Sequence, residues 1–275
     1  MSADSPEHIE GYVLATGSEG EDRLELVEEV HGPDTEQLLQ RAGIERGMNV
    51  ADIGCGIGIV AGRIADMVGP SGECVGIDCS EAQIEVARRR AAESRSRPNL
   101  SFQVGSAYQT GLPDGALSAV YARFLLMHLA RPTEAIAEMI RLLRPGGILV
   151  VEDGDFSAPY CVPVSPAYDR CFELYREAVK LTGADPLIGA DLPRLVMDSG
   201  FRECNVAIVQ PMLRDGEAKR LPEWTLGEVA PALIEAGVAS GDEIAAVTMQ
   251  MRRLALDSTT KFAMAQMTQV WARKS

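Results

Sequence analysis

The nine residues VADIGCGIG, at positions 50–58, decide the fold of this chain. A short apolar run ends in Asp52, three glycines follow at every second position, and a helix-like stretch covers residues 59–68. Glycines in such a strand–turn–helix unit let backbone N–H groups approach a ligand closely, because no Cβ stands in the way. Asp52 has the wrong charge for a diphosphate and suits a ligand with a positively charged end. The sequence therefore predicts a ligand site at this turn.

Strand-like and helix-like segments alternate around the glycine turn. Strands are predicted at 50–53, 74–78, 100–104, 117–121 and 148–152, and helices at 57–68, 80–93 and 132–143. This alternation predicts an α/β fold with a parallel sheet and helices on both faces. The fifth strand is β-branched and apolar up to Glu152, as expected for a strand that is buried on both faces.

The flanking segments follow other patterns. Before the core, an acidic amphipathic helix is predicted at 19–31, and a second helix, capped by Asp34, at 35–42. After it, helices are predicted at 168–181 and 192–199, a strand at 201–210, a helical region at 216–258 with a hinge at 237–241, and a last strand at 261–272. We interpret residues 1–275 as one domain, with an N-terminal helical cap at 1–45 and a helical lid at 216–258.

Composition narrows the classes of partner. The 275 residues carry a formal net charge of −14, so an acidic body would repel nucleic acid. The arginines at 88, 89, 90, 95 and 97 are interpreted as a solvated helix end. No apolar stretch approaches the roughly 20 residues that span a bilayer, no signal peptide is recognisable, and the six cysteines form no C-x-x-C pair. We expect a cytoplasmic protein with free thiols and no stable membrane association.

Several side chains follow the predicted strands at the edge where ligands bind in open parallel sheets. Asp52 ends the first strand, and Asp78 ends the second, 20 residues past Gly58, which is the usual distance for a carboxylate that binds two ribose hydroxyls. Ser106 and Ala107 follow the third strand and Arg123 follows the fourth. These residues are the candidate ligand site.

Three other site types are disfavoured. The dinucleotide fingerprint G-x-G-x-x-G/A fails because its sixth position is Ile59. A serine hydrolase is disfavoured because the sequence contains no G-x-S-x-G motif. The acids at 152, 153 and 155 suggest a metal, but Ala122 and Arg123 stand where a metal-dependent enzyme of the catechol type has an acid, and an arginine beside a metal is unfavourable. We therefore expect no metal.

Five motifs, in order, carry a family resemblance. DIGCGIG at 52–58 resembles the first motif of class I S-adenosylmethionine-dependent methyltransferases, and GIDCS at 76–80 resembles their second. LPDG at 112–115, LLMHL at 125–129 and LRPGGIL at 143–149 resemble the run found in ubiquinone/menaquinone-type C-methyltransferases and their small-molecule relatives. The match covers residues 10 to 210 approximately, which is most of the chain.

The resemblance implies a doubly wound, seven-stranded, mostly parallel Rossmann-like sheet. Its last strand, 261–272, would be antiparallel, and the helical region 216–258 would be an insertion before it. S-adenosylmethionine would be the cofactor. Its implied binding residues are Tyr12, Asp52, Gly54, Cys55, Gly56, Asp78, Cys79, Ser106, Ala107 and Arg123.

Roles follow from the same resemblance. Asp52 and the glycine turn would hold the methionine end, under Tyr12, and Asp78 the ribose hydroxyls; residues 105–107 would hold the adenine edge. Ser106 replaces the usual aspartate of the third motif, and a hydroxyl accepts a hydrogen bond more weakly than a carboxylate does. His128, just beyond the fourth strand, is the candidate general base, with packing as its alternative role.

The expected activity is methyl transfer to a small organic acceptor, such as a secondary metabolite, by in-line displacement. A quinone-pathway C-methyltransferase, or a cofactor-binding protein or cyclase that transfers no methyl group, is the alternative. Trp224 and Tyr160 could stack on an aromatic acceptor. The N-terminal segment and residues 216–258 could equally form a homodimer interface.

Overall fold

The computed structural model describes Leu14, Thr16 and residues 20–94 and 97–275; the predicted site residue Tyr12 lies outside them. The helices are α1 (Glu21–Ala42), α2 (Ile59–Val68), α3 (Glu81–Ser94), α4 (Pro132–Leu142), α5 (Pro166–Leu181), α6 (Ile188–Asp198), α7 (Leu221–Glu235) and α8 (Gly241–Leu256), with 3-10 turns η2 (Gly69–Ser71), η3 (Leu126–His128) and η4 (Glu217–Arg220). The strands are β1 (Asn49–Ile53), β2 (Glu73–Asp78), β3 (Leu100–Val104), β4 (Leu117–Arg123), β5 (Leu143–Asp155), β6 (Tyr160–Val162), β7 (Asn205–Val209), β8 (Met212–Leu213), β9 (Lys261–Ala263) and β10 (Gln266–Arg273).

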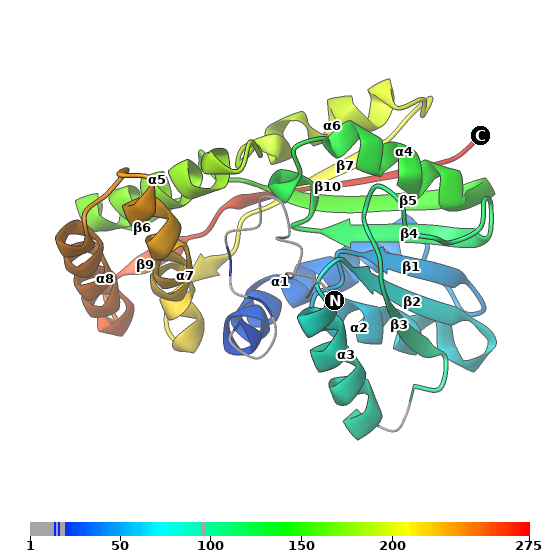
Figure 1. Cartoon of the computed structure of the whole chain (residues 1–275), viewed down its shortest axis with the longest axis horizontal. Coiled ribbons are helices and arrows are strands. Elements are labelled where there is room, and N and C mark those ends of the chain that lie inside the picture. The colour runs from blue at the N-terminus through cyan, green and yellow to red at the C-terminus, as the bar shows by residue number, and fades with distance from the viewer. Residues whose placement is uncertain (1–13, 15, 17–19, 95–96) are drawn as a thin grey trace, which may run out of the picture.

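Seven strands form the central sheet, in the order β3-β2-β1-β4-β5-β10-β7. The pairs among β1 to β5 are parallel, and β10 runs antiparallel between β5 and β7 (Figure 1). The order reverses between β1 and β4, which is where a doubly wound sheet opens a crevice for ligands. The predicted fold class is confirmed. A smaller antiparallel sheet, β6-β9-β8, was not predicted.

Alternating side chains of the central strands build one hydrophobic core on each face of the sheet. Val50 and Val150 pack with α2, α3 and the second half of α1, whereas Ala51 and Val151 pack with α4, α5 and α6. In Figure 1, α4 and α6 lie above the sheet and α2 and α3 below it. Burial of both faces explains the continuous apolar run of β5 that the sequence displays.

Helix α1 corrects one prediction. The sequence suggested two helices separated at Gly32-Pro33, with Asp34 as a cap, but α1 runs through Pro33 as one helix. Proline normally interrupts a helix because it lacks an N–H and crowds the preceding turn. Here the second half of the helix is held in place by tertiary contacts, because the buried Thr35 hydroxyl donates to Glu152 on β5. Long-range anchoring outweighs the local break signal.

The last predicted strand is also corrected. Residues 261–272 form two strands, β9 and β10, which belong to different sheets. Met264 and Ala265 separate them, and the Met264 N–H donates to the carbonyl of Pro211, at 2.9 Å, instead of continuing a ladder. The break in the helical region is confirmed, since α7 ends at Glu235 and α8 begins at Gly241.

Helices α5, α7 and α8 pack together at one end of the molecule, beside the small sheet (Figure 1). An ion pair of 2.8 Å between Arg23 on α1 and Glu228 on α7 ties this end to the N-terminal helix. Within the described part of the chain, no helix has the length and apolar character needed to cross a membrane.

Candidate ligand site

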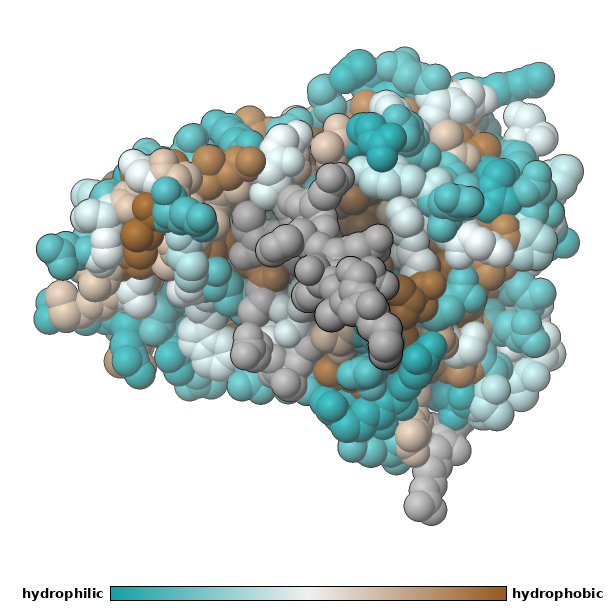
Figure 2. Space-filling view, viewed as in Figure 1, coloured by the Kyte–Doolittle hydropathy of each residue, from teal (hydrophilic) through white to brown (hydrophobic). Residues whose placement is uncertain are grey.

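A cavity of about 1120 Å³ opens at the carboxyl ends of the central strands. Except for Tyr12, every predicted site residue lines it: Asp52, Gly54, Cys55, Gly56, Asp78, Cys79, Ser106, Ala107, Arg123 and His128. Its volume exceeds the roughly 300–1,000 Å³ typical of a site for one small ligand. Figure 2 shows hydrophobic residues around the middle of this face, on the side of the half that carries β1 to β3.

The backbone conformation of the glycine turn requires glycine at three positions. Gly54, Gly56 and Gly58 have φ angles of +74°, +52° and +77°, in the left-handed region that residues with a Cβ rarely adopt. A Cβ on Gly58 would also lie 2.5 Å from the ring of Phe102. The N–H groups of Gly54 and Cys55 both donate to the carbonyl of Ile77, at 2.7 and 3.0 Å, which fixes the turn against β2.

Asp78, at the end of β2, connects the turn to the start of α3. Its two carboxylate oxygens accept from the N–H groups of Gly56 and Ser80, each at 2.9 Å. Burial raises the pKa of Asp78, and these N–H groups act in the opposite direction. Each oxygen retains a second lone pair, so the carboxylate can hold the turn and still accept from a ligand.

Asp52 is the least satisfied group of the site. Its side chain is 2% exposed, and Oδ2 has no hydrogen-bond partner. Burial raises its pKa to about 7, while the nearby Arg123 guanidinium acts to lower it and Asp78 to raise it further. A buried carboxylate without a partner is costly, and a cationic ligand group would relieve that cost.

Unpartnered buried polar atoms are concentrated in this cavity wall. Besides Asp52 Oδ2 they include Gln83 Oε1, at the start of α3, and Nδ1 of His31, on α1. Buried polar groups in folded proteins nearly always have partners. Three of these unpartnered atoms therefore belong to side chains that line one cavity, whereas those of Arg63 and Gln269 do not.

A row of polar side chains crosses the central strands beneath α1. Asp52 on β1 lies beside Tyr121 on β4 in the sheet register, and Glu152 on β5 lies between Arg123 and Gln269. The Tyr121 hydroxyl donates to Glu152, as does the amide of Gln269, at 2.8 Å. Tyr121 and Gln269 were not predicted as members of this row, because each lies within a predicted strand and no local pattern indicates which strands pair.

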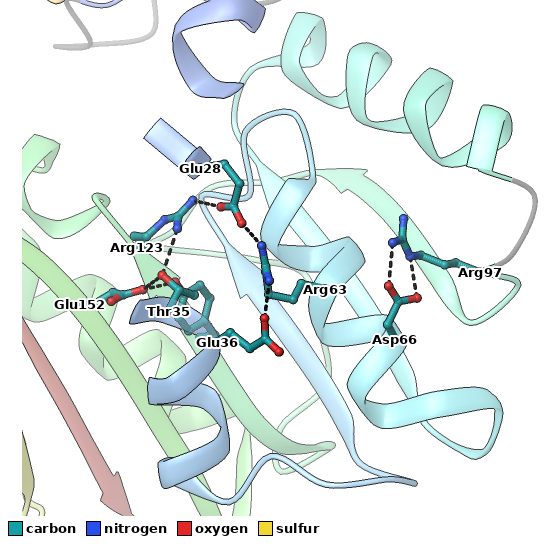
Figure 3. Close-up of polar contacts among 9 residues, drawn as sticks. Glu28, Thr35, Glu36, Arg63, Asp66, Arg97, Arg123 and Glu152 are labelled. Atoms are coloured by element: carbon teal, nitrogen blue, oxygen red, sulfur yellow. Dashed lines mark hydrogen bonds and ion pairs between the residues drawn. The ribbon is translucent and has the colours of Figure 1, made fainter. Parts of the chain in front are cut away.

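Arg123 joins the polar row to α1. Its guanidinium donates to Glu28, at 2.8 Å, and to the Thr35 hydroxyl, at 3.0 Å (Figure 3). Glu28 also pairs with Arg63 of α2. Burial acts to lower the pKa of Arg123, but Tyr121 and Glu28 raise it overall. The charge of Arg123 is therefore balanced by protein groups, and its contacts fix the position of α1.

Ser106 and Ala107 lie in the cavity wall after β3. The Ser106 hydroxyl accepts from the Tyr108 N–H at 3.2 Å, and its carbonyl accepts from Gln109 at 3.1 Å. These bonds form a tight local turn that holds residues 105–107 against the cavity. Cys79, next to Asp78, is exposed at the surface, and partial desolvation together with the charge of Asp78 raises the pKa of its thiol.

The acids at the carboxyl end of β5 have other partners. Asp153 accepts from the N–H groups of Leu126 and Met127, at 2.9 and 3.4 Å, and so holds η3, which ends at His128, in place. Asp155 accepts from Ser157 at 2.8 Å. Among the residues that the structure describes, no three His, Cys, Asp or Glu side chains are grouped so as to hold a metal ion.

His31, on α1, is a cavity residue that was not predicted from the sequence. It follows Leu24 and Val27, which also line the cavity, at helical spacing. That spacing was the available signal. Trp224 and Tyr160, named as stacking residues, do not line the cavity: Trp224 lies under the guanidinium of Arg220, and Tyr160 is 45% exposed on β6.

The arginine cluster at the end of α3 is paired with acids of α1 and α2. Arg90 contacts Glu21 and Glu25, both at 2.7 Å, and Arg97 contacts Asp66. Arg89 pairs with Glu21 at 2.8 Å, Arg88 donates to the carbonyl of Phe102 at 2.9 Å, and Arg95 lies outside the described residues. Acids of α1 therefore balance Arg89 and Arg90, and Asp66 of α2 balances Arg97.

Comparison with known proteins shows which family the central part of the chain resembles. Residues 50–147 match a family model described as a methyltransferase domain. The chain is 34% identical, over 187 residues, to a 37.1 kDa protein from a Streptomyces fradiae transposon, covering 66% of this chain and 51% of that protein. The O-methyltransferase cnsE of Penicillium expansum is 27% identical over 205 residues, covering 74% of this chain and 70% of its own.

The ubiquinone/menaquinone biosynthesis C-methyltransferase UbiE of Pseudomonas putida is 34% identical over 131 residues, covering 48% of this chain and 50% of its own. The chain spans about half the length of most of the curated relatives it matches. Among solved structures, a methyltransferase-like protein of Bacillus halodurans aligns with a TM-score of 0.61 at 17% identity, covering 88% of this chain and 99% of its own. At that identity the likeness concerns the fold alone.

Proposed function

Because the chain belongs to the class I S-adenosylmethionine-dependent methyltransferase superfamily, we propose that it transfers the methyl group of S-adenosylmethionine to a small organic acceptor. The observation that carries this proposal is the unpartnered, buried Asp52 carboxylate beside the glycine turn. It suits the cationic methionine end of this cofactor and would repel a diphosphate.

Residues at three strand ends would each contact a different part of the cofactor. Asp52 and the glycine turn would hold the methionine end, and Asp78 the ribose hydroxyls. Residues 105–107 would hold the adenine edge, with Ser106 in place of a carboxylate. S-adenosylmethionine, when bound, supplies a methyl group that is already activated by a sulfonium with a neutral thioether as leaving group.

The protein's own task is orientation and exclusion of water. Burial, and then the charge of Arg23, lower the pKa of His128 to about 3. A general base works best with a pKa near the operating pH, so His128 is neutral but weakly basic in this setting. We therefore assign His128 to the cavity wall, and expect His128→Gln to slow transfer by less than the roughly 100-fold that loss of a general base causes.

The acceptor is proposed to be small and free in solution. The alternatives, a quinone-pathway C-methyltransferase or a binding protein that transfers no methyl group, are not favoured, since the match to the quinone enzymes covers only 48% of this chain. Free thiols at all six cysteines fit a cytoplasmic protein.

We propose that α7 and α8 form a lid over the cavity, and the support is that Leu221 and Thr225 of α7 line the cavity. A homodimer stays a prediction.

The test combines binding and turnover. Calorimetry with S-adenosylmethionine and S-adenosylhomocysteine measures cofactor affinity, and labelled methyl transfer to a panel of phenols, amines and quinols measures activity. Transfer to a panel member supports the proposal. Binding without any transfer would instead support the binding-protein alternative, and failure to bind either cofactor form would refute both.

A further inference from the structure

We propose that His31 is a specificity-determining residue of the acceptor site, where its imidazole accepts a hydrogen bond from a hydroxyl of an uncharged, ring-containing acceptor. The inference rests on the proposed function, since it concerns the part of the same cavity that the cofactor residues leave open. The sequence motifs around the glycine turn imply no role in acceptor binding for residues of α1.

The part of the cavity away from Asp52 and Asp78 is mainly apolar. It is lined by Phe124, Phe156, Phe172, Leu221, Pro222 and Met264. These side chains come from five separate segments, and three of them are aromatic. Flat apolar rings fill such a space well, because aromatic pairs prefer offset or edge-on contacts within it.

The charges near this part of the cavity are already balanced. Arg123 pairs with Glu28, and Arg23 with Glu228, both at 2.8 Å. An anionic acceptor would have to compete with these buried carboxylates for its counter-charge. A neutral acceptor meets no such competition, and this is why we assign an uncharged one.

His31 lies in this apolar wall with a ring nitrogen unsatisfied. Its side chain is buried, at 4% exposed, and Nδ1 has no hydrogen-bond partner. The ring contacts Phe124 edge-on, with centroids 5.0 Å apart and an angle of 79° between planes. Burial, and then the charge of Arg123, lower the His31 pKa to about 3. The imidazole is therefore neutral, so one of its nitrogens accepts a hydrogen bond.

The other polar side chains in this wall are used locally. The Thr225 hydroxyl donates to the Leu221 carbonyl at 2.8 Å, and the Cys171 thiol to the Pro222 carbonyl at 3.5 Å. Within the apolar wall described here, the His31 imidazole is therefore the group that a ligand hydroxyl would hydrogen-bond. A hydroxyl here donates a bond and removes an unsatisfied acceptor at once.

Helix α1 holds His31 rigidly. One face of the helix carries Leu24, Val27 and His31 to the cavity, and a neighbouring face carries Glu28 and Thr35 to Arg123, Arg63 and Glu152 (Figure 3). Since both faces are fixed at once, the imidazole keeps its place when the cavity is empty. A preformed acceptor of this kind discriminates by chemistry rather than by rearrangement.

The experiment compares two probes of nearly the same shape, 2-naphthol and 2-methylnaphthalene, on the protein saturated with S-adenosylhomocysteine. Quenching of probe fluorescence gives the two dissociation constants. We expect the wild type to prefer 2-naphthol by about tenfold, which is the discrimination worth one hydrogen bond. His31→Phe should abolish the preference, whereas His31→Asn, which keeps a polar group near Nδ1, should retain part of it.

Val27→Ala is the matched control, because it enlarges the same wall without removing a polar group; both affinities should change together and the preference should persist. An unchanged preference in His31→Phe would overturn the proposal, as would equal affinities or no binding of either probe in the wild type. Binding of S-adenosylhomocysteine is measured first in every variant. Its failure in the wild type would refute the proposed function instead.

Discussion

Asp52→Asn should stabilise the protein without its cofactor and at the same time weaken cofactor binding. Asp52 is buried with one oxygen unpartnered, and its pKa of about 7 lies above the ordinary 3.8. The folded state therefore retains a proton that the unfolded state has released between these two values. The contribution of Asp52 to stability falls as pH rises from about 4 to 7 and stays at its lowest level above that.

The magnitude follows from the same two values. Each pKa unit corresponds to about 1.4 kcal/mol, so the raised pKa of Asp52 costs the folded state ~4 kcal/mol at pH 8, where the carboxyl is ionised, and ~2 kcal/mol at pH 5, where it retains its proton. An amide has the shape of the protonated carboxyl and carries no charge. Asp52→Asn should therefore raise stability by up to these amounts, with the larger gain at pH 8, which is several degrees in Tm.

Cofactor binding should change in the opposite direction. A charge-assisted hydrogen bond is worth about 1.5–3 kcal/mol, so losing the carboxylate should weaken S-adenosylmethionine binding by about 10- to 100-fold at pH 7.5. At pH 6.5 most wild-type Asp52 carboxyls are protonated, and an incoming ammonium group expels that proton. Calorimetry in phosphate and Tris should then give different apparent enthalpies for the wild type and equal ones for the variant.

Asp153→Asn is the matched control. Burial also raises the Asp153 pKa to about 7, but its oxygens accept from backbone N–H groups, and an amide would turn a donor toward one of them. This variant should show no gain in stability. The reasoning would be refuted if Asp52→Asn left the unliganded protein no more stable at pH 8, or bound S-adenosylmethionine as tightly as the wild type.

Three further predictions concern the site and the elements that hold it. Gly58→Ala should destabilise the fold by at least about 3 kcal/mol in urea unfolding, since φ is +77° and a Cβ would lie 2.5 Å from the Phe102 ring. Gly111→Ala is its control: φ is +79° but the space around it is open, so the loss should be only about 1–2 kcal/mol, and equal losses would contradict the crowding argument. A double-mutant cycle of Arg23→Ala and Glu228→Ala should give a coupling of about 1–3 kcal/mol across α1 and α7, and a coupling near zero would show that the pair does not join them. Asp78→Asn should weaken S-adenosylmethionine binding by about tenfold or more, measured by calorimetry, and unchanged affinity would show that the ribose contact was assigned wrongly.

The succession of strands and helices in the core and the positions of the candidate site residues could be predicted from the sequence because both are local patterns. A run of apolar residues, a glycine turn and a capped helix each depend on neighbours within one element. The carboxyl ends of parallel strands share one edge of the sheet, so Asp52, Asp78 and Ser106 could be placed near each other from their positions after predicted strands.

Contacts between distant segments were decided by the tertiary structure alone. Thr35 and Glu152 are 117 positions apart, and Glu28 and Arg123 are 95 apart. These bonds make α1 a single helix through Pro33 and turn His31 toward the cavity, against the local signal for a break. The glycine turn is a property of the sequence, whereas the wall opposite it exists only after the chain has folded, because its side chains come from elements that no local pattern connects.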